Sequence, residues 1–363
     1  MTIIPARVGL QQRVFPEYRA PFFNLLAKSC LQGFSLFTGL PREEEAIRTA
    51  LGLQNADYQQ GRNLHISKGN TYFCYQSGLI HWLHRWQPNV LIMEANPRYL
   101  ATPAAANWMH AHGHPVIAWG LGAPPRGKTE TLLRLNFLRL FDAIITYSKN
   151  GAEQYAACGI NPRKIFVAAN SMVSRPTQPA PFKPEEYKDG KACLLFVGRL
   201  QERKKLDVLL QACAGLPNQL KPKLVIVGDG PDRARLEELA ASVYPETQFA
   251  GGKHGVELEP YFNKADLFLL PGTGGLAVQQ AMAHALPVIV GQADGTQDEL
   301  VRPENGWTLP DSDTATVTRT LADALADVKR LRRMGLASYR IVAEEVNIES
   351  MVETFAKAIK SVL

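Results

Sequence analysis

Short apolar runs alternate with helical patterns along the whole chain. In the first half, the runs that predict buried strands are FSLFTG, NVLIME, PVIAWG and DAIITYS, and TETLLRLNFLRLF predicts a helix. The alternation restarts in the second half with ACLLFVGR, KLVIVGDG, TQFAGG, DLFLLPG and PVIVG. Buried strands that alternate with helices indicate an α/β fold with two doubly wound parallel sheets. In such sheets, ligands bind at the carboxyl ends of the strands.

A proline-rich stretch separates the two halves. Residues 173–190 hold four prolines and show little periodicity, which predicts an interdomain linker. We expect a first domain at 1–172, completed by an amphipathic C-terminal helix at 350–363, and a second domain at 191–349.

The composition of the chain limits the classes of protein to which it is expected to belong. The chain has 363 residues, of which 46% are apolar and 20% charged, so it can fill large cores and is not disordered. No apolar run of about 20 residues predicts a membrane span, and the N-terminus lacks the basic and apolar segments of a signal peptide. The five cysteines are scattered without a CxxC pair, which is typical of free thiols in a reducing compartment. These features favour a cytoplasmic protein.

Net positive charge is confined to the first half. Residues 1–180 carry 18 Lys and Arg against 9 Asp and Glu, whereas residues 181–363 carry 22 against 25. A basic half fits either an ordinary solvated face or peripheral association with the anionic inner face of the cell membrane. The basic residues do not form a run interleaved with aromatic residues, so nucleic acid is not an expected partner.

Two loops of the second half carry the chemistry of a phosphate site. Gly198 and Arg199 end one strand, and Lys204 follows as a helix begins. Cations are unfavourable at the positive end of a helix, so their position suggests an anion that both contact, with a solvated basic turn as the alternative. After a later strand, the glycine turn at 272–275 opens a second helix whose N–H groups favour an anion. Together the two loops predict a diphosphate cradle.

The same turn also matches a dinucleotide fingerprint. The pattern GxGxxA falls on Gly272, Gly274 and Ala277, and Asp294 lies about 20 residues further on, where a ribose-binding acid is expected. An NAD-dependent oxidoreductase is therefore an alternative. Against it, this fingerprint should open the first strand–helix unit of a domain, and several such units precede it here.

Five ordered motifs of the second half resemble one known family. From Ala192 to about Pro310, the chain is similar to the nucleotide-binding domain of retaining GT-B glycosyltransferases of the family-four type, also called glycosyl transferases group 1. The motifs are FVGRLQERKKLDVLL, LVIVGDGPDRARLEELA, PYFNKADLFLLPG, LAVQQAMAHALPVIV and DELVRPENGWTLP. The first half is similar more loosely. The resemblance implies two Rossmann-like domains that face a central cleft, with the acceptor on the first domain and the donor on the second.

The resemblance also implies roles for residues on the donor side. Arg199 and Lys204 match the family's phosphate-binding pair, and Glu299 matches a glutamate near the sugar or the ribose, so these three are the expected catalytic residues. The expected donor-binding residues are Gly198, Gly230, His254, Gly274, Gly275, Leu276 and Gln280.

One family motif is altered in this chain. The family carries two glutamates separated by seven residues, and Gly272 and Gln280 stand at these positions. An amide can still bind a ribose hydroxyl, whereas glycine offers no side chain. The resemblance therefore implies intact phosphate binding with altered sugar recognition. A non-catalytic nucleotide-sugar binding protein is a further alternative.

By this resemblance, the reaction moves a sugar from a nucleoside diphosphate sugar to a hydroxyl of a glycan, a lipid-linked acceptor or a small molecule. The anomeric configuration is retained, and neither a metal nor another cofactor is expected, because cations stabilise the departing diphosphate. The one DxD sequence, at 311–313, is expected to form a turn. The three histidines at 110, 112 and 114 do not have the spacing of a helical metal site.

Acceptor contacts are expected at strand ends in the first half. Arg19 is expected to contact an anion or else to be a surface arginine, and Glu94 to serve as a polar substitute for a histidine of the family or as a capped strand end. The full set of candidates is Tyr18, Arg19, Glu94, Asn96, Trp119, Gly120 and Ser148.

Overall fold

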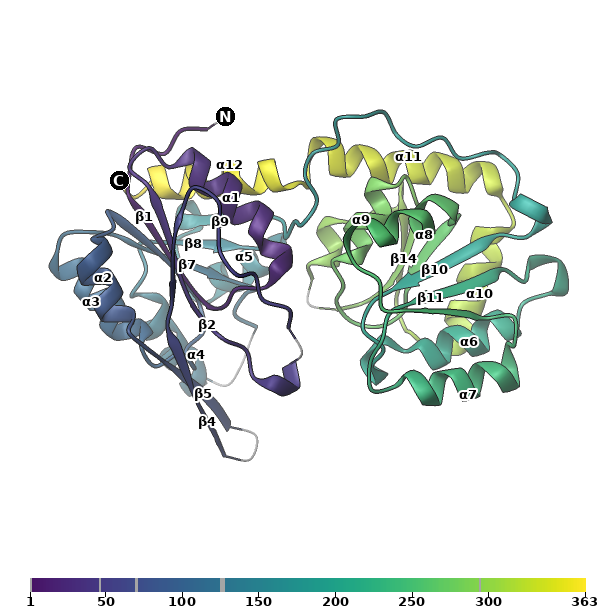
Figure 1. The fold of residues 1–363 in the computed structure, drawn as a ribbon, viewed down its shortest axis with the longest axis horizontal. Helices are drawn as coiled ribbons and strands as arrows, with labels where there is room; N and C mark the ends of the chain where they lie inside the picture. The colour runs from purple at the N-terminus through teal and green to yellow at the C-terminus, as the bar shows by residue number, and fades with distance from the viewer. Residues whose placement is uncertain (1, 46, 69–70, 125–127, 294) are drawn as a thin grey trace. The chain divides into compact units, whose positions relative to one another are not determined.

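The computed structural model describes residues 2–45, 47–68, 71–124, 128–293 and 295–363, which form two compact units (Figure 1). The first unit comprises Met1–Ser174 and Ile348–Leu363, and the second comprises Arg175–Asn347. Each unit is a doubly wound α/β domain, so the fold class expected from the sequence is confirmed. Within the described ranges, no helix is long and apolar enough to cross a membrane.

The first unit is built on a seven-stranded parallel sheet. Its strand order is β3-β2-β1-β6-β7-β8-β9. The four apolar runs of the first half form β2, β6, β7 and β8, whereas β1, β3 and β9 lie outside those runs. The strands span Val8–Val14 (β1), Phe34–Gly39 (β2), Asp57–Gln60 (β3), Val90–Glu94 (β6), Val116–Gly120 (β7), Ala143–Thr146 (β8) and Ile165–Val167 (β9).

Helices cover both faces of this sheet. On one face, α1 (Ala20–Ser29) packs against the C-terminal helix α12 (Ile348–Lys360), with the rings of Phe22 and Phe355 4.9 Å apart. Fully burying one such ring stabilises the fold by about 2–3 kcal/mol. The other face is covered by α2 (Leu79–Trp86), α3 (Thr102–Ala111), α4 (Lys128–Leu138) and α5 (Lys149–Ala157). An antiparallel hairpin of β4 (Arg62–Lys68) and β5 (Thr71–Ser77) completes the unit.

The second unit has a six-stranded parallel sheet of order β12-β11-β10-β13-β14-β15. Its strands span Cys193–Val197 (β10), Lys223–Val227 (β11), Gln248–Gly251 (β12), Leu267–Leu270 (β13), Val288–Gly291 (β14) and Gly306–Leu309 (β15). The five apolar runs of the second half form β10 to β14. The central strands β10, β13 and β14 are buried on both faces and so have nearly continuous apolar sequence, whereas the edge strand β12 is only partly buried.

Helices cover both faces of the second sheet (Figure 1). One face carries α6 (Leu206–Ala214), α7 (Arg233–Val243) and α10 (Thr314–Leu325). The other face carries α8 (Glu259–Lys264), α9 (Ala277–Ala283) and α11 (Val328–Glu344).

Each sheet reverses its strand order beside its first strand. In the first unit, the chain runs outward from β1 to β2 and β3 and then returns to β6 on the other side of β1. In the second unit, it runs outward from β10 to β12 and returns to β13. At such a point the loops on the two sides of the reversal diverge and leave a crevice at the carboxyl ends of the strands. The topology therefore predicts ligand sites between β1 and β6 and between β10 and β13.

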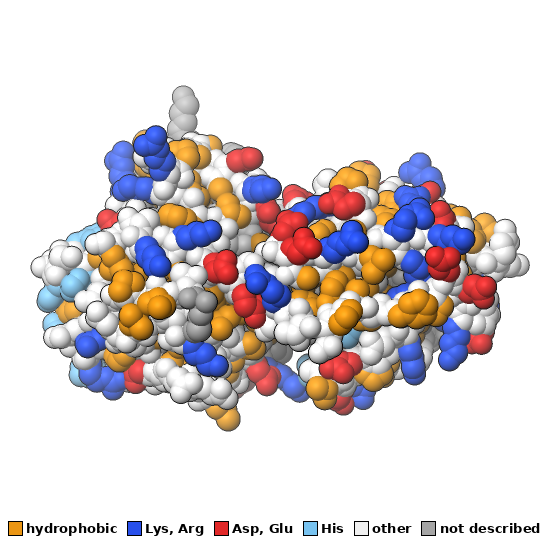
Figure 2. All heavy atoms as spheres, turned by 90° about the horizontal axis from the view of Figure 1, so that it is seen from above, with side chains coloured by type: hydrophobic (Ala, Val, Ile, Leu, Met, Phe, Trp, Pro, Cys, Tyr) orange, Lys and Arg blue, Asp and Glu red, His pale blue; other side chains and the backbone are white. Residues whose placement is uncertain are grey.

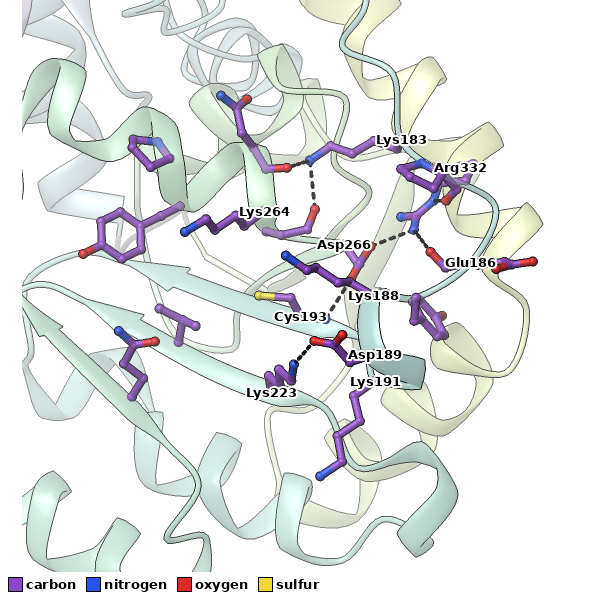
Figure 3. A pocket seen from close by; sticks show the side chains of 18 of the residues that line it. Lys183, Glu186, Lys188, Asp189, Lys191, Cys193, Lys223, Lys264, Asp266 and Arg332 are labelled. Atoms are coloured by element: carbon purple, nitrogen blue, oxygen red, sulfur yellow. Dashed lines mark hydrogen bonds and ion pairs between the residues drawn. The ribbon is translucent and has the colours of Figure 1, made fainter.

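The linker packs where the strands of the second sheet begin, at the end away from their carboxyl ends. It lies there around a cavity of about 1090 Å³ (Figure 3). Lys183 donates from Nζ to the carbonyl oxygens of Phe262, Asn263 and Ala265, at distances of 2.7 to 3.0 Å. Arg332 donates to Asp266 at 2.7 Å, and both side chains are about nine-tenths buried. The cavity adjoins the amino ends of β10 and β11, so it lies at the edge away from the loops where ligands are expected.

Loss of the Arg332 guanidinium should destabilise the second unit. Arg332→Ala leaves the buried Asp266 carboxylate without its ionic partner, so we expect the free energy of unfolding to fall by about 3 kcal/mol or more. Arg333→Ala, at the exposed neighbouring position, should change it by less than about 0.5 kcal/mol. Urea-induced unfolding followed by circular dichroism measures both variants. Equal effects of the two would contradict the role of the ion pair.

Candidate functional site

The residues expected on the donor side come together at one edge of the second sheet. Each follows the carboxyl end of a strand, and parallel strands present these ends at the same edge. In chain order they are Gly198 and Arg199 after β10, Gly230 after β11, His254 after β12, Gly274, Gly275 and Leu276 after β13, and Glu299 after β14.

Lys204 joins the two loops at the strand-order reversal. It ends the short 3₁₀ helix η5 (Glu202–Lys204) and is 5% exposed. Its Nζ donates to the carbonyl oxygen of Thr273 at 2.6 Å and to that of Gly274 at 2.9 Å. In return, the backbone N–H of Thr273 donates to the carbonyl oxygen of Arg203 at 3.1 Å. The loop after β10 and the glycine turn after β13 are thus held as one piece.

The buried ammonium of Lys204 is electrostatically poised for an anion. Burial, together with the nearby positive charge of Arg203, lowers its pKa to about 8. An ammonium has three N–H donors, and two of them serve the carbonyl oxygens of the turn. A bound diphosphate would satisfy the remaining donor and stabilise the charged form of the side chain.

Gly272 is a glycine because the neighbouring loop leaves no room for a side chain. A Cβ at this position would lie 2.0 Å from the carbonyl oxygen of Arg203 and 2.5 Å from the Cα of Lys204. The same close approach brings the Lys204 ammonium within reach of the turn. As the two loops pack here, position 272 has no room for the glutamate that the resemblance to the family would place there.

The two glutamines of α9 differ in their surroundings. Gln279 is fully buried, and its Nε2 donates to the carbonyl oxygen of Val346 at 2.7 Å, which ties α9 to the residues that follow α11. Gln280 is half-buried. The helix begins at Ala277, so Gly275 and Leu276 precede it. Among the described residues, the N–H groups of Gly275 and Leu276 have no hydrogen-bond acceptor.

Arg203 is a candidate that the sequence did not single out. The basic run ERKK suggested a solvated turn. In the structure, the exposed Arg203 reaches over the glycine turn, with Nη1 3.4 Å from both the carbonyl oxygen and Oγ1 of Thr273. The position of Arg203 directly before Lys204 could have identified it from the sequence. It adds a third cation to the edge that holds Arg199 and Lys204.

The remaining donor-side candidates differ in exposure. Arg199 and Glu299 are half-buried, whereas His254 is exposed and begins the 3₁₀ helix η7 (Gly255–Leu258). At Gly230, a Cβ would lie 2.2 Å from the carbonyl oxygen of Leu200, so this glycine permits the loops after β10 and β11 to meet. Asp294, the acid of the dinucleotide alternative, lies outside the described residues.

A cavity of about 170 Å³ marks the strand-order reversal of the first unit. It lies where the loops after β1 and β6 diverge, and three of the expected acceptor residues line it: Tyr18, Arg19 and Glu94. Arg13, Tyr99 and Tyr147 line it as well and were not predicted. Arg13 is the second cation of this cavity, and it pairs with Glu45 at 2.9 Å.

Arg19 is not the surface arginine that the sequence left open. It is 4% exposed and lies within 5.3 to 5.6 Å of the ring centres of Tyr18, Trp119 and Tyr147. Its Nη2 donates to Oδ1 of Asn170 at 2.7 Å.

Glu94 ends β6 at the floor of this cavity. Its Oε2 accepts a hydrogen bond from the backbone N–H of Arg13 at 2.5 Å. Burial raises the pKa of its carboxyl group to about 7, against the opposing effects of that hydrogen bond and of the charges on Arg13 and Arg19.

Four other residues that were expected to contact the acceptor instead make packing, capping or turn contacts within the first unit. Trp119 is 2% exposed and packs among the core phenylalanines, and the fully buried Ser148 caps α5 by accepting from the N–H of Gly151 at 3.0 Å. Asn96 accepts from the N–H of Arg98 within its own turn. At Gly120, a Cβ would meet the hydroxyl of Tyr155 at 2.7 Å. None of these four lines the cavity described above.

The described residues hold no cluster of three or more His, Cys, Asp or Glu side chains suited to a metal ion. Histidines gather on the outside of α2 and α3 (Figure 2), where His112 stacks on Trp108 and His110 pairs with Asp142 at 3.1 Å. In the DxD sequence, Asp313 caps α10 by accepting from the N–H of Thr316 at 2.9 Å.

Residues 178–341 match the family model described as Glycosyl transferases group 1. The match confirms, for this part of the chain, the resemblance that the ordered motifs indicate. The chain is 38% identical over 158 residues to a GDP-mannose-dependent alpha-mannosyltransferase of Mycobacterium tuberculosis, a match that covers 42% of this chain and 39% of that protein. It is 33% identical over 153 residues to a protein of the same name from Corynebacterium glutamicum, covering 41% and 35%. The matches thus span less than two fifths of these curated relatives.

Solved structures share the fold of the whole chain. Anabaena Alr3699/HepE in complex with UDP is similar over 99% of this chain and 100% of its own, with a TM-score of 0.71 and 13% identity. The apo form of the lipopolysaccharide outer core galactosyltransferase WaaB is similar over 98% and 100%, with a TM-score of 0.72 and 16% identity. The chain therefore has the GT-B fold of two Rossmann-like domains.

The close packing at Gly272 can be tested by adding one methyl group. Gly272→Ala forces the glycine turn away from the backbone of Arg203, and we expect it to lower the free energy of unfolding by about 2 kcal/mol. Gly272→Glu, which rebuilds the family's first glutamate, should be less stable still. The control is Gly252→Ala, where the nearest atom lies at 3.8 Å and the change should stay within about 0.5 kcal/mol. Chemical denaturation measures all three. Wild-type stability of Gly272→Glu would show that the turn has room for the side chain.

Proposed function

We propose that this protein transfers a sugar from a nucleoside diphosphate sugar to a hydroxyl group of an acceptor, because residues 178–341 match the glycosyl transferases group 1 family. The observation that carries the proposal is the Lys204 ammonium, which bridges the loops after β10 and β13 where the strand order reverses. This is where an open α/β sheet binds its ligand.

In the proposed complex, Lys204 and Arg199 bind the diphosphate, with the N–H groups of Gly275 and Leu276 as further donors. Negative charge grows on the β-phosphate as its bond to the sugar breaks, and fixed cations at that position lower the barrier. Arg203 is proposed as a third cation on the open side of the turn. Gln280 and Glu299 are proposed to bind the ribose or the sugar, a task for which amide and carboxylate oxygens are suited.

We further propose that the reaction proceeds without a metal and retains the anomeric configuration, with the acceptor hydroxyl attacking from the side of the leaving group. Cations of the protein would then replace the metal in neutralising the diphosphate. The nucleotide could be guanosine or uridine diphosphate. The mannosyltransferase relatives are named for GDP-mannose, and the Anabaena structure holds UDP.

The first unit is proposed to bind the acceptor, at the cavity beside Arg19 and Glu94. Its excess of basic residues is proposed to bring the protein to an anionic membrane surface from the cytoplasmic side. Association with vesicles containing anionic lipid, weakened by salt, would support that part of the proposal.

Calorimetry with UDP, GDP, ADP and dTDP in the presence of EDTA tests the donor site. We expect one diphosphate to bind to the wild type and to lose about a hundredfold in affinity, roughly 3 kcal/mol, in Lys204→Ala and Arg199→Ala. Lys205→Gly is the matched control. Lys205 is an exposed neighbouring cation with a backbone φ of 52°, a conformation in which glycine is unstrained, so the variant should fold and bind normally.

Assays of turnover and of NAD binding distinguish the proposed glycosyltransferase from a non-catalytic binding protein and from an oxidoreductase. Release of the bound diphosphate from its sugar conjugate, measured with EDTA present, would establish an enzyme. Binding without any release would favour a nucleotide-sugar binding protein. Binding of NAD that survives Lys204→Ala, with no diphosphate bound, would favour the oxidoreductase.

A further inference from the structure

The cavity of the first unit contains an arginine that forms no ion pair with any described carboxylate. Among the described residues, no Asp or Glu lies within ion-pair distance of the Arg19 guanidinium. Its polar neighbours are neutral: the amide of Asn170 at 2.7 Å, the hydroxyl of Tyr147 at 3.4 Å and the sulfur of Met351 at 3.8 Å. A guanidinium that is only 4% exposed is costly to bury without an anion nearby.

Aromatic rings hold this guanidinium in place. The ring centres of Tyr18, Trp119 and Tyr147 all lie within 5.6 Å of its central carbon, so each contributes a cation–π interaction. These contacts fix the orientation of Arg19, but they do not neutralise its charge. The side chain lines the 170 Å³ cavity, which is open to a ligand.

The second cation of the cavity is already neutralised. Arg13 pairs with Glu45 at 2.9 Å, and Glu45 also accepts from the backbone N–H of Arg42. Glu45 does not itself line the cavity, whereas the carboxyl group of Glu94 does. The charge that remains to be balanced is therefore that of Arg19, and it is balanced by Glu94 only when Glu94 is ionised.

We propose that this cavity binds a carboxylate or phosphate group of the acceptor, with the Arg19 guanidinium as its ionic partner. The inference rests on the proposed function in identifying the ligand as the acceptor. The volume is below the roughly 300–1,000 Å³ of a pocket for a drug-sized ligand, so it suits one charged substituent or one acidic sugar ring. Arginine presents paired N–H donors that match such oxygens.

Glu94 should make this binding depend on pH. Burial raises the pKa of its carboxyl group to about 7, so it is neutral below that pH and negative above it. A negative Glu94 repels the anion, and binding should therefore weaken as the pH rises through 7. The titratable and charged groups around Glu94 are Arg13 of β1 with its partner Glu45 after β2, Tyr18 and Arg19 before α1, Cys74 of β5, Tyr99 after β6 and Tyr147 after β8.

Calorimetry without nucleotide tests the proposal with three probes. Methyl glucuronide supplies a carboxylate that is ionised throughout, glucose 6-phosphate supplies a phosphate, and methyl glucoside is the neutral control. We expect at least one anionic probe to bind at least about tenfold more tightly than methyl glucoside, and the better of the two identifies the acidic group. Equal binding of the glucoside, or no binding of either anion at pH 6, would overturn the proposal.

Variants separate an ionic role of Arg19 from a structural one. Arg19→Gln should abolish binding of the anion, whereas Arg139→Gln, an exposed cation after α4, should leave it unchanged. For the wild type, affinity for methyl glucuronide, whose charge is constant in this range, should be about tenfold higher at pH 6 than at pH 8.

Glu94→Gln tests the pH dependence in a variant that keeps Arg19. It can still accept the hydrogen bond from Arg13, and it should bind at pH 8 as tightly as the wild type does at pH 6. Binding by Glu94→Gln no tighter than the wild type at pH 8, or undiminished binding by Arg19→Gln, would contradict the proposal. Because no nucleotide is present, these results stand whether or not Lys204 binds a diphosphate.

Discussion

The candidate donor site depends on a buried ammonium that bonds to two backbone carbonyls. Lys204 and the turn at Thr273 and Gly274 can meet only because the two loops approach closely, and this approach in turn excludes a side chain at position 272. Burying a charge without such partners would be strongly destabilising. The contact therefore accounts for both the position of the cation and the need for glycine at position 272.

The two units use the same topological position for different chemistry. In the second unit, the reversal between β10 and β13 gathers the cations Arg199, Arg203 and Lys204. In the first unit, the reversal between β1 and β6 gathers Arg19 and Glu94 around a small cavity. The edge at the β10–β13 reversal suits a ligand with several negative charges. The cavity at the β1–β6 reversal suits a single acidic group with neighbouring hydroxyls.

Much of the fold and of the donor edge could be predicted from the sequence, because buried parallel strands are continuous apolar runs and their carboxyl ends share an edge. β1 was missed since Gln11 and Gln12 interrupt its apolar pattern, although both are buried and the Gln11 side chain bonds to Gln76. Contacts between segments that are far apart in the chain cannot be recognised from the sequence pattern of either segment. The backbone of Arg203 against Gly272 and the rings around Arg19 became visible only in the structure.

Hydrogen exchange with and without the nucleoside diphosphate that binds most tightly tests the location of the donor site most directly. The account predicts slower exchange of backbone amides at 198–205 and 273–280, with no change around the cavity beside Lys183 and Arg332. Protection around that cavity, with none in the two loops, would contradict the assignment of the donor to the β10–β13 crevice.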